Sequence, residues 1–262
     1  MLKKLIGDKA FYRKVMLVAI PIIIQNGISN FVSLLDNIMV GQVGQLQMSG
    51  VAIVNQLIFV FYLCIFGAAS GAGIFTAQFH GCRDDDNIRH TFRFKMIFCL
   101  FLSVAAICIL TLMGTPLVML YLKGEGSLTS VASTLSLAKQ YLAVMVIGLI
   151  PYAISQCYGS TLREAGRATV PMIAGVIAVV INLVLNYILI FGKFGAPRLG
   201  VVGAAVATVI SRFEILVLHH AEQIKILLNI SYICISQIIV IIYPIFIYTE
   251  ICMCSKCCYI RI

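Results

Sequence analysis

The chain has 262 residues, of which 61% are hydrophobic and only 11% are charged. Soluble globular domains carry about 25% charged residues, so this composition excludes a water-soluble fold and indicates an integral membrane protein. The formal net charge of +9 does not indicate a nucleic-acid partner, because the basic residues are dispersed in short clusters that are typical of membrane topology signals.

The first apolar segment, residues 15–40, contains a single carboxylate. Asp36 is the only Asp, Glu, Lys or Arg between Lys14 and Arg83. As one helix the segment is long enough to cross a bilayer of about 30 Å, and a carboxylate inside such a span usually marks a pathway for ions or substrate. The alternative is that Asp36 only bonds a neighbouring helix. The residues expected on its helical face are polar: Gln25, Ser29 and Ser33.

Five further apolar segments follow the first one. They are residues 50–79, 96–122, 138–160 and 175–191, and a sixth that begins at 201–211. These lengths predict an all-α integral membrane protein, a bundle of six transmembrane helices. We expect no metal site, because the Cys-rich stretch at 252–258 lacks a histidine or a second paired motif nearby.

The distribution of Lys and Arg predicts the orientation in the membrane. Twelve of them lie at the N-terminus, in the second and fourth connectors, and at Arg212, whereas the alternate connectors hold four. Positive residues favour the cytoplasmic side. We therefore expect a multi-pass protein of the plasma membrane with its N-terminus in the cytoplasm.

A layer of polar side chains is expected at one depth in this bundle. Counting the helical rise inward from the outer turns places five residues roughly 7 to 15 Å below the outer ends of their helices. Asn182 and Asn186 are four residues apart and therefore share a helix face. The layer predicts a shared polar cavity, although Asn and Thr also serve as contacts between packed helices. The five residues are Asp36, Asn55, Asn182, Asn186 and Thr208.

Several motifs in residues 5–212 resemble one family of transporters. Pro21 and Asp36 are separated by fourteen residues, and DNIMVGQVG starts at Asp36. AQFHG follows at 77–81, LREAGRATVPM at 162–172, and INLVLNYILIFGKFGAPRLGVVGAAVATVISR at 181–212. In combination these stretches are similar to the multidrug and toxic compound extrusion (MATE) family of cation-coupled efflux transporters.

The resemblance implies a six-helix N-terminal lobe, a pseudo-symmetric second lobe and an outward-opening cleft between them. It implies that Asp36 is the group that responds to the coupling ion, H⁺ or Na⁺. Some members carry a second acid on the fifth helix, where this chain has Asn186, so Asp36 is left alone. Small cationic or amphiphilic drugs and the lipid bilayer are the implied partners, with no cofactor, no catalytic residue and no nucleic acid. The expected cavity-lining residues are Gln25, Ser29, Ser33, Asn55, Asn182, Asn186 and Thr208.

The composition changes after Arg212. All twenty glycines lie at or before Gly203, and residues 213–262 hold fifteen isoleucines and one alanine. We therefore expect a MATE-like lobe at 1–212 and an atypical tail at 213–262, unrelated or out of frame, with one possible extra span at 224–249. On this interpretation a second lobe is missing, or a second half-transporter chain supplies it.

Three alternatives stay open from the sequence. A lipid-linked oligosaccharide flippase of similar architecture would need several cationic residues in its cavity, and the expected spans hold essentially none. A membrane enzyme acting on lipid phosphates needs clustered carboxylates; Asp84, Asp85 and Asp86 are the only cluster, and their setting favours a solvated connector. The third alternative is an inactive half-transporter.

Overall fold

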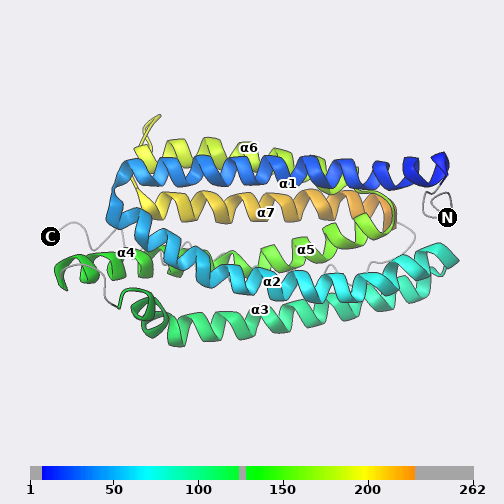
Figure 1. Ribbon diagram of the computed structural model, residues 1–262, viewed down its shortest axis with the longest axis horizontal. Coiled ribbons are helices and arrows are strands. Elements are labelled where there is room, and N and C mark those ends of the chain that lie inside the picture. Colours follow the sequence, from blue (N-terminus) through cyan, green and yellow to red (C-terminus); the bar gives the residue numbers. More distant parts are fainter. Residues whose placement is uncertain (1–7, 124–127, 228–262) are drawn as a thin grey trace, which may run out of the picture. The chain divides into compact units, whose positions relative to one another are not determined.

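A computed structural model describes residues 8–123 and 128–227 of the chain, and its regular structure there is entirely α-helical. Figure 1 shows the helices, with colours that follow the chain from the N-terminus to the C-terminus. This confirms the predicted all-α class. The elements are α1 (Lys9–Val43), α2 (Gln45–Cys82), α3 (Asp85–Tyr121), α4 (Leu128–Ile147), α5 (Leu149–Glu164), α6 (Thr169–Phe191) and α7 (Val201–Leu227).

Six of the described helices are long and apolar enough to cross a membrane: α1, α2, α3, α4, α6 and α7. The bundle therefore has the predicted number of spans. The fourth expected span, residues 138–160, differs from the structure, because α4 and α5 divide at Gly148. Large apolar side chains such as Leu112, Phe66 and Ile97 are more than half exposed on the bundle surface. Such a surface suits contact with lipid.

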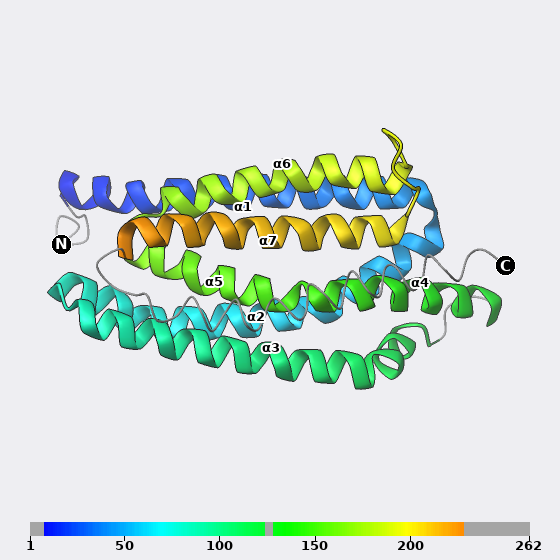
Figure 2. The same cartoon turned by 180° about the vertical axis from the view of Figure 1, so that it is seen from behind.

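The helices of residues 8–220 form two groups, which meet where α1 packs against α2 and α5 packs against α6. α2 packs against α3, α4 and α5, and α1 packs against α6. Figures 1 and 2 show α1, α6 and α7 running along one another. α7 contacts α6 through Thr208, which lies beside Asn182, and contacts α5 through His219, which lies beside the carbonyl of Ser155.

α1 and α2 join through a single residue. The predicted apolar segments 15–40 and 50–79 leave residues 41–49 between them, but only Gly44 lies outside the two helices. Gly44 has φ 153° and ψ 162°, a backbone conformation that is essentially restricted to glycine. The chain therefore reverses direction at one position rather than over a loop.

The charged stretch between α2 and α3 is shorter than the sequence suggested. Only Arg83 and Asp84 lie between the two helices. Arg83 ends α2 in the left-handed conformation, and the Asp84 side chain accepts a hydrogen bond from the backbone N–H of Asn87 at 3.1 Å and so caps α3. Hydrogen bonds from the Asn87 side chain and backbone lower the pKa of Asp84.

α7 continues without a break through Arg212 to Leu227. The chain divides into two compact units, residues 1–220 and 221–262. The composition change at residue 213 falls inside this helix, and the proposed boundary there stays a prediction. The possible span at 224–249 lies outside the described residues except for its first four positions.

Candidate functional site

A cluster of four polar side chains lies between α1, α6 and α7. Nδ2 of Asn186 donates a hydrogen bond to Oδ1 of Asp36 at 2.7 Å. The same nitrogen lies 3.2 Å from Oδ1 of Asn182, and Nδ2 of Asn182 lies 3.5 Å from Oγ1 of Thr208. We call these four residues the Asp36 cluster. The helical rise had placed them at one depth, and the structure brings them together.

The amide groups of the cluster are buried and aimed at the carboxylate. Asn182 and Asn186 are 7% and 1% exposed, and Oδ1 of Asn186 has no hydrogen-bond partner among the described residues. Exchanging the oxygen and nitrogen of the Asn182 amide puts its nitrogen 3.1 Å from Oδ2 of Asp36, an assignment that the hydrogen-bond network favours. Both carboxylate oxygens of Asp36 then have an amide donor.

This arrangement can hold a cation as well as a proton. Asp36 and Thr208 supply carboxylate and hydroxyl oxygens, and the amides of Asn182 and Asn186 would add oxygens if they turned over; such oxygens are the ligands that hard cations prefer. Oδ1 of Asn186 is a buried acceptor without a hydrogen-bond partner among the described residues, and such an acceptor is costly unless a donor or a cation reaches it.

The other predicted cavity residues lie elsewhere. Asn55 is exposed on α2 and accepts a hydrogen bond from the Tyr141 hydroxyl of α4 at 3.2 Å. Ser29 is half-buried and Ser33 is exposed, and neither joins the cluster by a hydrogen bond in the described parts of the chain. Gln25 lies near Gly175 of α6, where a Cβ would come within 2.7 Å of its Nε2.

Some basic residues that were expected in connectors are buried in the helical bundle. Lys95 of α3 is 1% exposed, and its Nζ lies 2.8 Å from Oε2 of Glu164 in α5, with Ser160 and Thr161 as further partners. Lys95 lies one position before the expected span 96–122 but inside α3, so the helical bundle encloses a cation that the expected span left out. Lys95 and Glu164 are 69 positions apart, so no local pattern pairs them.

Arg212 was expected at the cytoplasmic end of the sixth span, but it is buried within α7 and only 8% exposed. Its guanidinium donates a hydrogen bond to the Tyr62 hydroxyl and lies 5.4 Å and 5.5 Å from the ring centres of Tyr62 and Tyr152. Aromatic faces stabilise a guanidinium in this position. A charge at the end of an apolar run therefore did not mark the end of the helix.

Comparisons with known sequences and with solved structures agree on one protein family. The sequence pattern of the MatE family matches residues 21–188. The probable multidrug resistance protein NorM of Thermotoga maritima is 30% identical over 201 residues, which cover 77% of this chain and 42% of that relative. The protein of the same name in Bacillus subtilis is 30% identical over 199 residues, covering 76% and 42%. The chain thus spans less than half the length of these relatives.

Solved structures show the same fold. A crystal structure of MATE in the bent conformation is 22% identical, with a TM-score of 0.69, and the match covers 79% of this chain and 44% of that one. An outward-facing multidrug resistance MATE family transporter of the MOP superfamily is 23% identical, with a TM-score of 0.69, covering 81% and 45%. Because the family pattern matches well over half of the chain and the helical bundle is shared, this multi-pass membrane protein belongs to the MatE family.

Proposed function

We propose that the chain forms the N-terminal lobe of a cation-coupled multidrug efflux antiporter and exports small cationic or amphiphilic compounds. Asp36 takes the coupling ion, H⁺ or Na⁺. The Asp36 cluster is the single observation that carries this proposal. The second lobe comes from the remainder of a longer protein or from a second chain, and the transporter lies in the plasma membrane with its N-terminus in the cytoplasm.

Three features of the cluster support an ion-binding role rather than simple helix packing. The Asp36 carboxylate of α1 accepts a hydrogen bond from Asn186 of α6, and Thr208 of α7 lies beside Asn182 of α6. The charge of Asp36 therefore lies in a network that joins three helices. No Lys or Arg pairs with Asp36 among the described residues. The unpaired Oδ1 of Asn186 leaves one acceptor for the ion. A packing contact would satisfy these groups without an ion.

In the proposed transport cycle, the coupling ion and the cationic substrate compete for the charge of the Asp36 carboxylate. With an ion bound, Asp36 is neutralised, and the lobe does not attract a cationic substrate. When the ion leaves, the carboxylate attracts the cation from the cleft. Coupling requires that the ion and the drug favour different arrangements of the two lobes, since a ligand shifts an equilibrium only by its differential affinity.

The test uses a two-lobed form in which residues 1–212 replace the matching lobe of the Thermotoga maritima relative. Asp36→Asn removes the charge and nearly preserves the shape of the side chain. We expect loss of ethidium efflux from an efflux-deficient host while the protein still reaches the membrane. Asp86→Asn, a change of the same kind at an exposed position of α3, should leave efflux unchanged. If Asp36→Asn exports ethidium at the same rate as the two-lobed protein that retains Asp36, then Asp36 serves only in helix packing.

A second candidate function, the lipid-linked oligosaccharide flippase, gains support from one observation. Arg212 and Lys95 are buried inside the bundle, so the lack of cations no longer argues against an anionic substrate. Lys95 is neutralised by Glu164, and the relatives matched at 30% identity carry multidrug names, so drug efflux remains the first proposal. Transport of a labelled lipid-linked sugar, but not ethidium, by the two-lobed form would favour the flippase.

A further inference from the structure

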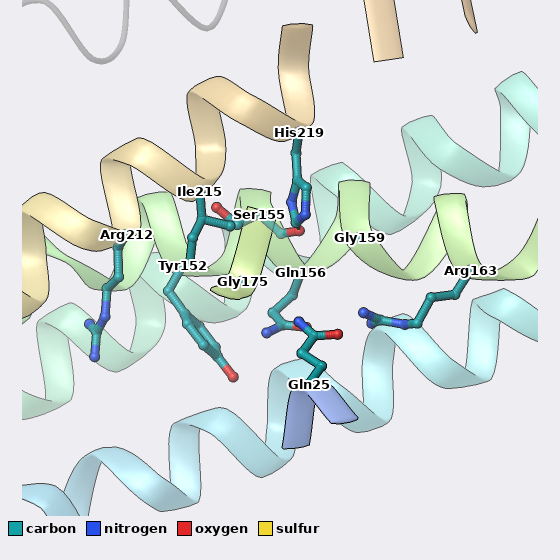
Figure 3. Close-up of a pocket in the computed structure, with 10 residues that line it drawn as sticks. All are labelled: Gln25, Tyr152, Ser155, Gln156, Gly159, Arg163, Gly175, Arg212, Ile215 and His219. Atoms are coloured by element: carbon teal, nitrogen blue, oxygen red, sulfur yellow. The ribbon is translucent and has the colours of Figure 1, made fainter. Parts of the chain in front are cut away.

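A second polar site lies further along the helices from the α1–α2 join than the Asp36 cluster does. A pocket of about 80 Å³ opens between α1, α5, α6 and α7. Figure 3 shows Arg163 and His219 pointing toward Gln156 and Gln25, with Tyr152 between these groups and Arg212. The remaining lining residues are Ser155, Gly159, Gly175 and Ile215. We call this the Arg163 pocket.

The Arg163 pocket is separate from the Asp36 cluster. The separation is eleven residues on each of three helices: Gln25 to Asp36 on α1, Gly175 to Asn186 on α6, and Thr208 to His219 on α7. At a rise of about 1.5 Å per residue, these pairs are about 16 Å apart along the bundle. Arg212, which also lines the pocket, is the lining residue on α7 nearest the Asp36 cluster, so the centre of the pocket around Arg163 and His219 is distinct from the cluster.

Glycines create the space that the polar side chains occupy. A Cβ on Gly159 of α5 would lie 3.1 Å from Cε1 of His219 and 3.5 Å from Nη1 of Arg163. A Cβ on Gly175 of α6 would lie 2.7 Å from Nε2 of Gln25. Both contacts are closer than ordinary packing allows or at its limit. The missing side chains let polar groups from three helices converge.

The charge of the pocket is not balanced by the protein in residues 8–123 and 128–220. Neither Arg163 nor Arg212 has an ion pair with a carboxylate there. Glu164 follows Arg163 in the chain and attracts its guanidinium, but this one carboxylate already forms an ion pair with Lys95 at 2.8 Å. Nη1 of Arg212 has no hydrogen-bond partner. Arg212 is buried and Arg163 is half-buried, and two guanidinium groups withdrawn from water with too few counter-charges favour a negative ligand.

His219 contributes an unpaired atom to the same pocket. The residue is 4% exposed, and its Nδ1 lies 3.2 Å from the carbonyl oxygen of Ser155. A carbonyl only accepts, so Nδ1 carries the proton and Nε2 is left as an acceptor. Nε2 has no partner among the described residues. A water beside it can donate one hydrogen to Nε2 and the other to an anion.

We propose that the Arg163 pocket binds an oxyanion, the carboxylate or phosphate group of a ligand, with Arg163 as its main donor. A planar guanidinium matches the geometry of two oxygens of such a group. A water needs about 10–15 Å³ by this measure of volume, so the pocket has room for one oxyanion and a bridging water. The group belongs to a free ion or to a lipid headgroup, and the test separates the two.

The experiment measures thermal unfolding of the purified chain in lipid-free detergent at constant ionic strength, balanced with sodium chloride. Sodium phosphate and sodium acetate are the free oxyanion probes, and added phosphatidylglycerol is the lipid probe. We expect saturable stabilisation by at least one of these probes. Arg163→Gln should weaken the apparent affinity about tenfold or more, the size expected for one charge-assisted hydrogen bond. Arg163→Lys should restore part of it.

Two controls match these variants. Arg198→Gln makes the same change of charge at an exposed loop position and should bind as the unmodified chain does. Gly159→Ala fills the pocket without changing its charge and should also weaken binding, whereas Gly67→Ala, where a Cβ would meet nothing within 4 Å, should not. The alanine pair keeps the test decisive if Arg163→Gln fails to fold.

The probe that stabilises the chain distinguishes a free oxyanion from a lipid headgroup. Stabilisation by phosphate or acetate that Arg163→Gln loses supports a free oxyanion, and stabilisation only by phosphatidylglycerol, lost in the same variant, supports a headgroup. Three results would overturn the proposal: no stabilisation by any probe, equal stabilisation in Arg163→Gln and Arg198→Gln, or binding of Gly159→Ala at unmodified strength. The Asp36→Asn efflux test is independent, so either proposal can fail alone.

Discussion

The Lys95–Glu164 ion pair makes a sharp prediction at the scale of single residues. The Lys95 side chain has no exposed surface, and that of Glu164 is 15% exposed. Glu164→Gln leaves a buried ammonium without its counter-charge, which costs about 3–5 kcal/mol. Replacing both residues by Met removes both charges together and should recover most of this loss. Circular dichroism during thermal unfolding in detergent measures each variant.

The control for this pair is Asp86→Asn, which removes a carboxylate whose partner Arg89 lies at the surface at 3.2 Å. Exposed pairs contribute about 0–1 kcal/mol, so its unfolding temperature should hardly change. If the double Met variant is no more stable than Glu164→Gln, the unpaired charge of Lys95 is not what destabilises Glu164→Gln.

The Asp36 cluster shows what the sequence can predict for individual residues. Asp36 stands out because no other charge occurs between Lys14 and Arg83, and helical rise alone placed Asn182, Asn186 and Thr208 at its depth. The same reasoning included Asn55, which instead bonds Tyr141. Depth along a helix follows from counting, but the direction in which a helix face points depends on packing against its neighbours.

The buried cations could not be predicted in the same way. Lys95 and Arg212 stand beside other polar residues in the sequence, and positive charges near apolar runs commonly mark cytoplasmic loops. Their burial depends on partners from other helices: Glu164 for Lys95, and Tyr62 and Tyr152 for Arg212. Such long-range pairs have no local signature.

At the scale of elements, the join between α1 and α2 depends on Gly44. Its φ of 153° is strained for any residue with a Cβ, and that atom would lie 2.3 Å from Oε1 of Gln47. Gly44→Ala should therefore destabilise the chain by about 1–3 kcal/mol, the usual cost of a sparsely populated backbone conformation. Thermal unfolding in detergent checks this value.

Gly27→Ala is the matched substitution inside α1, where a Cβ would meet nothing within 4 Å. Alanine favours a helix over glycine by about 1 kcal/mol, so this variant should not lose stability. A Gly44→Ala chain that unfolds at the same temperature as Gly27→Ala would show that the join tolerates another conformation.

Two element boundaries differ from the sequence prediction for physical reasons. Gly148 divides α4 from α5 with an almost helical backbone, φ −76° and ψ −3°, so hydropathy does not change at the division, and only Gly148 and Pro151 signal it in the sequence. α7 continues through Arg212 because aromatic rings enclose the guanidinium. The number and order of the spans followed from hydropathy, which responds to composition rather than to such local contacts.

At the scale of the whole molecule, the Lys/Arg asymmetry predicts which end of the bundle faces outward. In a variant without native cysteines, Lys193→Cys in the loop after α6 should react with a membrane-impermeant maleimide in intact cells. Asp86→Cys at the start of α3 should react only after permeabilisation. Both positions are exposed, so access to the side chain is equal. Labelling of Asp86→Cys in intact cells would reverse the proposed orientation.

The most direct test of the central proposal measures ion-driven transport. The two-lobed form is reconstituted in liposomes, and ethidium movement is followed under an imposed H⁺ gradient or an imposed Na⁺ gradient. We predict that at least one gradient drives transport, that Asp36→Asn abolishes the response to that gradient, and that Asp86→Asn retains it. Gradient-driven ethidium transport by Asp36→Asn at the unmodified rate would contradict the assignment of Asp36 as the ion-coupling residue.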